Sequence, residues 1–125
     1  MKLFVSFLSM IVFFFVGLES GILVQKRNEL ETAQIASTVV EELKILDTIE
    51  RVIIAESGGK HQNVWGANGE YGVCQMKRQT FYWLAKKAGL NDPDWKNQIH
   101  QIYLLRWAIK NGYASHWSTF SKVRD

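Results

Sequence analysis

The sequence predicts an all-α fold, or an α+β fold at most through one small hairpin. Three segments, 47–56, 80–88 and 95–110, are predicted to be amphipathic helices, because their apolar residues recur mainly at intervals of three and four. Between the first two, residues 65–76 hold three glycines at intervals of three, which favours a tight loop or hairpin. Asn91-Asp92-Pro93 separates the last two helices, with Pro93 suited to a first helical turn. The 125 residues have room for one such domain and an N-terminal appendage.

The N-terminus has the layout of an export signal. Met1-Lys2 precedes an apolar run over residues 3–18, and apolar residues resume at 22–24. As a helix, residues 3–24 would extend roughly 33 Å, close to the hydrocarbon thickness of a membrane. We therefore expect residues 1–25 to be an uncleaved signal-anchor, with a cleaved signal peptide and a buried helix as the alternatives. Lys2 flanks one side of this segment and Lys26 with Arg27 the other, so charge does not predict its orientation. Export of the folded domain, anchored outside the cytoplasm or secreted after signal cleavage, is therefore an expectation that rests on what that domain does.

Residues 26–46 predict a helical spacer between this segment and the folded domain. They contain no glycine or proline and are rich in Glu, Ala, Leu and Val. A short coiled-coil contact with another chain is the alternative, although fewer than three clean heptads are present. Asp47 is expected to cap the next helix, which places the folded domain at 47–125.

Glu56 is the first residue that breaks the apolar pattern. It lies on the same predicted stripe as Ile49, Val52 and Ile53, and Ser57-Gly58-Gly59 then ends the helix. Apolar helix faces rarely end in a carboxylate without a reason. Partial desolvation at the lip of a cleft would favour the protonated carboxyl group that a general acid requires. A surface glutamate near a helix C-terminus is the alternative.

The glycine-rich loop carries groups that suit a sugar. Gly72 would let a ligand approach the backbone closely, and Gln75 has both an amide donor and a carbonyl acceptor. Trp65 and Tyr71 have flat faces on which sugar rings can stack. Opposite a cleft carboxylate, this loop predicts a carbohydrate site, with a packed turn around buried aromatic residues as the alternative.

Three ordered blocks of this sequence, followed by two later residue pairs, resemble the motifs of one family. They are Ile54–Gly59 with its Glu-Ser pair, Gly69–Met76 with a Gly-x-x-Gly-x-x-Gln pattern, Thr80-Phe81, Tyr103-Leu104 and Trp117-Ser118. In this order they resemble the soluble-type catalytic domain of the lytic transglycosylases, within the lysozyme-like superfamily, and are similar to resuscitation-promoting-factor domains. The likeness covers about residues 47–122. It implies a lysozyme-like helical domain in which a small loop region faces the helices across a cleft.

The resemblance implies cleavage of the MurNAc–GlcNAc bond of peptidoglycan by one glutamate acting as acid and then as base. Glu56 would protonate the glycosidic oxygen, and the substrate's 6-hydroxyl would attack C1 to give a 1,6-anhydro product. Ser57 would help to hold the Glu56 carboxyl group, Gln75 would contact the sugar, and Tyr103 would support the acid or the substrate. Cys74 stands where the family often has Met or another apolar residue, and the spacing before Tyr103 also departs from the family's pattern.

A second carboxylate would change the expected reaction, because ordinary glycoside hydrolysis uses two. Glu70, in the loop, is one candidate, with Asp92 and Asp94 as others. Glu70 would stabilise an oxocarbenium-like state or, as the alternative, be a solvated loop residue. Two other functions therefore stay open beside lytic transglycosylation: a hydrolytic muramidase and a non-catalytic glycan-binding or wall-assembly module.

No metal or cofactor is expected, and the charge balance alone does not identify a partner. His61, His100 and His116 are too scattered for a metal site, and the lone Cys74 is expected to be a small core residue rather than a nucleophile. Residues 47–125 carry eleven basic and seven acidic side chains, which suits a polyanionic partner, but they lack the basic and aromatic stripe of a nucleic-acid binder. The resemblance to lytic transglycosylases implies peptidoglycan strands as the partner, and the N-terminal apolar helix implies the membrane. The oligomeric state is not predicted.

Overall fold

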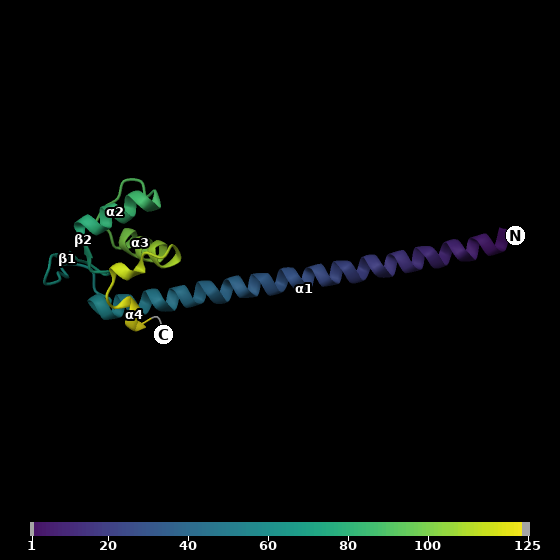
Figure 1. Ribbon diagram of the computed structural model, residues 1–125, viewed down its shortest axis with the longest axis horizontal. Coiled ribbons are helices and arrows are strands. Elements are labelled where there is room, and N and C mark those ends of the chain that lie inside the picture. The colour runs from purple at the N-terminus through teal and green to yellow at the C-terminus, as the bar shows by residue number, and fades with distance from the viewer. Residues whose placement is uncertain (1, 124–125) are drawn as a thin grey trace. The chain divides into compact units, whose positions relative to one another are not determined.

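The computed structural model describes the backbone of residues 2–123 and the side chains of residue 17 and residues 19–123. Within that part of the chain, the elements in order are α1 (Lys2–Ser57), β1 (Glu70–Tyr71), β2 (Met76–Lys77), α2 (Arg78–Ala88), α3 (Gln98–Lys110), η1 (Ala114–His116) and α4 (Phe120–Val123) (Figure 1). The prediction of a mainly helical fold with one small antiparallel hairpin is confirmed. The chain divides into two compact units, Met1–Val40 and Glu41–Asp125.

Helix α1 is continuous through the position at which the sequence predicted a new helix. The prediction of an N-cap at Asp47 is wrong, because no glycine or proline interrupts residues 22–57. The Asp47 carboxylate instead pairs with Arg51 one turn later, with Nε and Oδ2 3.1 Å apart. The helix does end at Ser57 as predicted, where Gly58 takes a φ of 62° that favours glycine.

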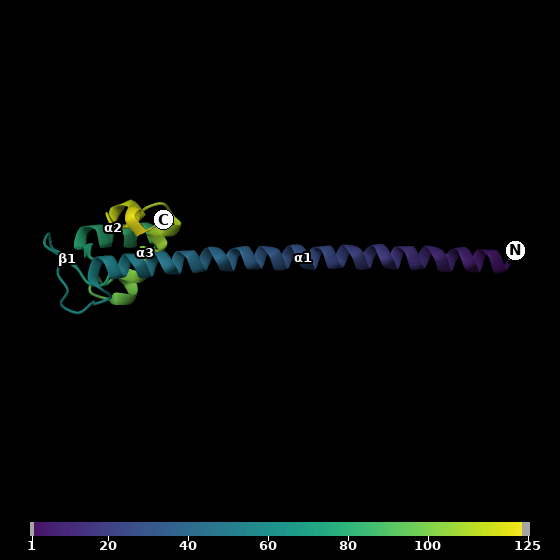
Figure 2. The same ribbon diagram turned by 90° about the horizontal axis from the view of Figure 1, so that it is seen from below.

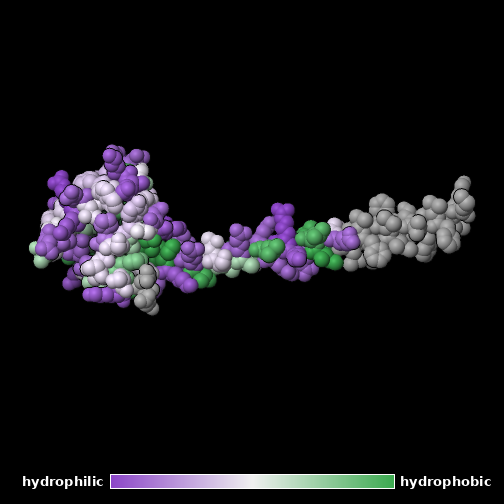
Figure 3. Space-filling model, viewed as in Figure 1, coloured by the Kyte–Doolittle hydropathy of each residue, from purple (hydrophilic) through white to green (hydrophobic). Residues whose placement is uncertain are grey.

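In the first unit, the predicted spacer is helical and its side chains are exposed. Leu30, Ile35 and Val39 are each more than half exposed, and Figure 3 shows apolar patches alternating with hydrophilic ones along this helix. No helix is both long and apolar enough to cross a membrane in the part of the chain whose side chains are described. Almost all of the apolar run at 3–18, which predicted the signal-anchor or signal peptide, lies outside those side chains, so that prediction stays open.

The second unit is built on the last turns of α1. The Glu42 carboxylate binds Arg106 and Lys110 of α3, with Arg106 Nη2 and Glu42 Oε2 2.7 Å apart. The hydrogen bond from Lys110, and after it the one from Arg106, hold the pKa of Glu42 below its usual value. The carboxylate therefore stays charged and links α1 to α3. Figures 1 and 2 show α2 and α3 lying side by side, with the hairpin at the end of the unit where α1 ends.

The core lies between these helices and the hairpin. The predicted stripes of α1 and α2 are confirmed, because their buried apolar residues are Ile49, Val52, Phe81, Leu84 and Ala85. Burying such side chains contributes roughly 1.5–3 kcal/mol each for the larger ones. Helix α2 begins at Arg78, slightly before the predicted start at Thr80.

Helix α3 buries a different face from the predicted one. The sequence predicted a stripe through Ile99, Ile102, Tyr103 and Trp107, whereas the buried residues are Gln101, Leu104, Leu105 and Ala108. Ile99 and Tyr103 are exposed. The helix also begins at Gln98 rather than Trp95, because Asn97 caps it by accepting hydrogen bonds from the first free backbone N–H groups. Pro93 therefore precedes the helix and does not occupy its first turn.

Candidate active site

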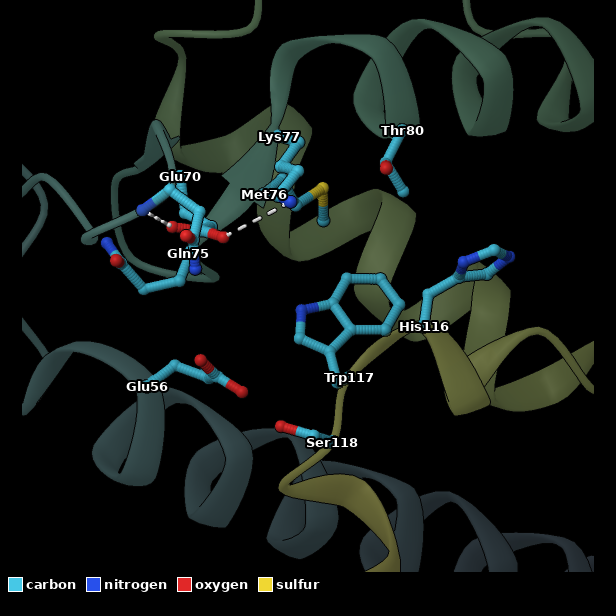
Figure 4. A pocket seen from close by; sticks show the side chains of 10 residues that line it. Glu56, Glu70, Gln75, Met76, Lys77, Thr80, His116, Trp117 and Ser118 are labelled. Carbon is cyan, nitrogen blue, oxygen red and sulfur yellow. Dashed lines mark hydrogen bonds and ion pairs between the residues drawn. The ribbon is translucent and has the colours of Figure 1, made fainter.

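Three of the predicted site residues, Glu56, Glu70 and Gln75, line one cavity of about 420 Å³ in the second unit. Its remaining lining residues are Asn68, Met76, Lys77, Thr80, His116, Trp117 and Ser118. Figure 4 shows Glu56, at the end of α1, on one side of this space, and Glu70 and Gln75, from the hairpin, on another. The structure therefore brings together residues from the two blocks that the sequence analysis singled out first.

Glu56 is half-buried in the last turn of α1, where the apolar stripe leaves it facing the cavity. The Thr119 hydroxyl donates a hydrogen bond of 2.6 Å to Glu56 Oε1. Thr119 immediately precedes α4, whose Val123 carbonyl accepts a hydrogen bond of 3.0 Å from Arg51 Nη1. Residues 119–123 thus fold back on α1, and Thr119 holds one carboxylate oxygen of Glu56. Sequence reasoning missed Thr119, because its partner is 63 positions away and no local pattern marks it.

The resemblance implied that Ser57 helps to hold the Glu56 carboxyl group, but the Ser57 hydroxyl contacts other groups. Its Oγ lies 2.7 Å from the Val73 carbonyl oxygen and 3.0 Å from that of Ile53, and its single proton is directed to these acceptors. The Ser57 hydroxyl therefore joins the end of α1 to the loop after β1. Its role is to fix where Glu56 sits relative to the hairpin.

Glu70 faces the cavity as a stabilised anion. Its Oε2 accepts a hydrogen bond of 2.9 Å from the Asn68 backbone N–H, and Lys77 Nζ lies 3.7 Å from its Oε1. Hydrogen bonds from the backbone N–H groups of Glu70 itself and of Asn68, with the charge of Lys77, hold the pKa of Glu70 below its usual 4.5. A carboxylate in this state stays ionised at neutral pH. It is suited to stabilising positive charge and unsuited to donating a proton.

Gln75 lines the cavity and also shapes the loop. Its backbone is left-handed, with φ 48°, and its Nε2 donates to the carbonyl oxygens of Gly72 at 2.8 Å and Val64 at 3.2 Å. A Cβ on Gly66 would lie 2.7 Å from Gln75 Oε1 and 2.4 Å from Glu70 Oε2. Glycine is therefore required at position 66 for these two side chains to approach the same backbone.

Gln101 of α3 is a buried polar residue that holds the loop through hydrogen bonds to its backbone, and sequence reasoning missed it. It is fully buried, accepts a hydrogen bond of 3.1 Å from the Cys74 N–H, and donates to the carbonyl oxygens of Tyr71 at 3.0 Å and Trp95 at 2.8 Å. A Cβ on Gly72 would lie 2.7 Å from Gln101 Nε2. Gly72, which has a φ of 82°, therefore makes room for Gln101 rather than for a ligand.

A second loop support is His61, which the sequence analysis left without a role. Its Nδ1 accepts a hydrogen bond of 3.0 Å from the Val73 N–H, and its Nε2 donates to the Lys96 carbonyl at 2.7 Å. Both ring nitrogens are therefore used by backbone groups on either side of the imidazole. This agrees with a structural role for His61 and leaves neither nitrogen for a ligand.

Two predicted site residues, Tyr71 and Tyr103, lie away from the cavity. Tyr71 is 7% exposed, and its ring packs 4.8 Å from that of Trp65 and 5.5 Å from that of Trp95, so the packed-turn alternative holds for this residue. Trp65 remains more than half exposed. Tyr103 lies on the exposed side of α3, where it lines a separate cavity with Arg106 and other residues of that helix. The shift of the buried face to Gln101 explains why Tyr103 points elsewhere.

Trp117 and Cys74 connect the cavity wall to the core. Trp117 is buried, lines the cavity, and donates a hydrogen bond of 2.8 Å from Nε1 to the Cys74 carbonyl. Cys74 is fully buried, as predicted for a small core residue. Burial, with the Glu56 carboxylate nearby, raises the pKa of the Cys74 thiol, so it stays protonated and is not a nucleophile.

No protein-family model, curated protein or solved structure matches this chain. The resemblance to lytic transglycosylases therefore stays a prediction from short motifs. The features that bear on function are the cavity, the carboxyl groups of Glu56 and Glu70 that face it, and the contacts that hold them.

Proposed function

We propose that the second unit is a lysozyme-like catalytic domain and that the chain is a peptidoglycan lytic transglycosylase. The observation that carries this proposal is the position of Glu56, at the end of an apolar stripe and on the wall of a cavity that the ionised Glu70 also lines. We also propose that residues 1–25 act as a signal-anchor, or as a cleaved signal peptide, so that the domain works outside the cytoplasm on glycan strands.

Glu56 would act first as the general acid. Thr119 engages Oε1, which leaves Oε2 to carry the proton toward a bound sugar. Proton transfer from Glu56 to the glycosidic oxygen breaks the bond between that oxygen and C1 of the MurNAc ring, and the leaving sugar departs with a new hydroxyl group. The 6-hydroxyl of the same MurNAc then attacks C1, and its proton goes to the Glu56 carboxylate. The product is a 1,6-anhydro ring, and Glu56 returns to its protonated form without consuming water.

Glu70 would stabilise the positive charge that develops on C1 and the ring oxygen during this step. Its backbone hydrogen bonds fix the carboxylate before the substrate binds, so little reorganisation is needed as the charge forms. The same observation favours a second candidate function. Two carboxyl groups on one cavity also suit a hydrolytic muramidase, in which Glu70 would activate water or form the covalent intermediate.

Product analysis distinguishes these reactions. The full-length chain would be incubated with purified peptidoglycan, and the soluble products analysed by mass spectrometry. Anhydro-muropeptides support the transglycosylase, whereas reducing ends that have gained the mass of water favour the muramidase. If no soluble product forms while the chain still sediments with peptidoglycan, both enzymatic proposals fail and a glycan-binding module remains.

A further inference from the structure

One face of α2 continues beyond the cavity and carries an exposed tryptophan. Thr80 lines the cavity, and Trp83 and Lys87 follow it at i+3 and i+7, so the three lie on one face of the helix. With a rise of 1.5 Å per residue, Trp83 lies about 4.5 Å and Lys87 about 10.5 Å further along the axis than Thr80. Trp83 is 40% exposed although it is one of the largest apolar side chains in the unit.

Contacts from η1 make this face continuous with the cavity. His116 lines the cavity, and its ring centroid lies 5.1 Å from that of Trp83. The Tyr113 ring is 5.5 Å from Trp83, and Lys87 Nζ lies 4.9 Å from the Trp83 ring and 5.4 Å from that of Tyr113. These four residues, Trp83, Lys87, Tyr113 and His116, are named here the Trp83 cluster. The cluster begins at the cavity rim and extends along α2.

The chemistry of the cluster suits a pyranose ring. An indole exposes a flat apolar surface against which the C–H face of a sugar can pack, as it does against other apolar groups. The Lys87 ammonium group lies over the Trp83 ring and the His116 ring packs against it, so both can bond to hydroxyl or carboxylate oxygens of a sugar that contacts the exposed part of the indole. A partly exposed indole in contact with such donors distinguishes the cluster from an isolated exposed apolar residue.

We propose that the Trp83 cluster is an additional sugar-binding site, which holds the glycan strand on one side of the bond cleaved at Glu56. The inference rests on the proposed function, because continuity with the cavity through His116 identifies the occupant as a further part of the same strand. A strand longer than the cavity passes His116 and reaches Trp83. A short oligosaccharide that fills the cavity alone does not reach it, so the cluster favours long substrates.

The test compares binding of short and long sugars by the full-length chain carrying Glu56→Gln, which keeps the cavity but not the proposed acid. Calorimetry with a chitin trisaccharide and a chitin octasaccharide would be repeated after adding Trp83→Ala. Loss of one stacking contact is expected to weaken octasaccharide binding about fivefold to tenfold and to leave trisaccharide binding unchanged. Trp83→Phe, which keeps a flat ring, is expected to retain most of the octasaccharide affinity.

Tyr82→Ala is the matched control, because Tyr82 is the neighbouring exposed aromatic residue of α2 (38%) and does not line the cavity. The inference is overturned if Trp83→Ala leaves octasaccharide affinity unchanged, weakens both oligosaccharides equally, or has no more effect than Tyr82→Ala. Thermal melting by circular dichroism checks that each variant is folded, and Trp83→Phe provides the comparison if Trp83→Ala is not. If the Glu56→Gln chain binds neither sugar, the proposed function fails together with the inference. Binding of both sugars without any contribution from Trp83 overturns the inference alone.

Discussion

Replacing Gln101 by leucine would test whether the loop that carries Glu70 and Gln75 depends on one buried amide. The substitution exchanges a fully buried polar side chain for an apolar one of similar size, so packing in the core is largely kept. It removes hydrogen bonds to three backbone groups, the Cys74 N–H and the carbonyl oxygens of Tyr71 and Trp95. Leucine cannot replace any of these three hydrogen bonds, because it has no polar atom in its side chain.

The expected loss of stability follows from these three contacts. Leaving a buried polar group unsatisfied costs about 1–3 kcal/mol, and carbonyl oxygens tolerate it better than N–H groups. The sum for Gln101→Leu is therefore about 3 kcal/mol, a large share of the roughly 5–15 kcal/mol that stabilises a typical domain. With a urea m-value of about 1.5 kcal/mol per M, within the usual range for small proteins, the unfolding midpoint would fall by about 2 M.

Urea unfolding of the full-length chain, followed by tryptophan fluorescence, measures this change. Gln98→Leu is the matched control, because Gln98 is an exposed residue of the same helix and its replacement is expected to change stability by less than about 0.5 kcal/mol. Cleavage of peptidoglycan should also fall in Gln101→Leu at temperatures where it is still folded, because the loop would no longer hold Glu70 in place. A midpoint within error of the Gln98→Leu value would refute the assignment of Gln101 as the support of the loop.

Three further predictions concern groups in or beside the cavity. Thr119→Val is expected to lower kcat about tenfold with little change in KM, because it removes a hydrogen bond to the Glu56 carboxyl group. Thr119→Ser keeps the hydroxyl group and should restore the rate. Equal rates for both variants would contradict a positioning role for Thr119. Glu70→Gln is expected to lower the melting temperature at neutral pH but not in acid. The lowered pKa means that the Glu70 contribution is present above its usual pKa and is lost as pH falls through the folded value; a difference independent of pH would argue against it. Cys74 should resist iodoacetamide in the folded chain and react fully in denaturant, because burial keeps its thiol protonated. Mass spectrometry measures the extent of labelling, and rapid labelling of the native chain would contradict the burial of Cys74.

The position of Glu56 and the hairpin could be predicted from the sequence because both depend on local signals. A stripe at helical spacing, stopped by two glycines, determines where Glu56 lies on α1. The glycine spacing around the loop likewise indicates a tight turn, and this places Glu70 and Gln75 on the same hairpin. The N-cap predicted at Asp47 failed for a related reason, since a cap residue ends or begins a helix only where neighbouring residues also break it.

The rest of the site depends on contacts between distant parts of the chain, which no local pattern records. Tyr103 was predicted on the inward face of α3, but the buried face is set by Gln101, whose partners lie on the loop and before the helix. Thr119 contacts Glu56 although it lies 63 positions later in the sequence. A glutamine and a threonine carry no sequence signal for burial or for positioning a carboxylate, so the structure was needed to find both.

The measurement that tests the central claim most directly is the rate at which soluble muropeptides are released by the full-length chain and by its Glu56→Gln variant under identical conditions. Glutamine keeps the size and the Thr119 contact of Glu56 but cannot transfer a proton, so the rate is expected to fall about 10²–10⁴-fold while glycan binding is retained. Equal rates for the two chains would contradict the assignment of Glu56 as the acid, and with it the proposed mechanism.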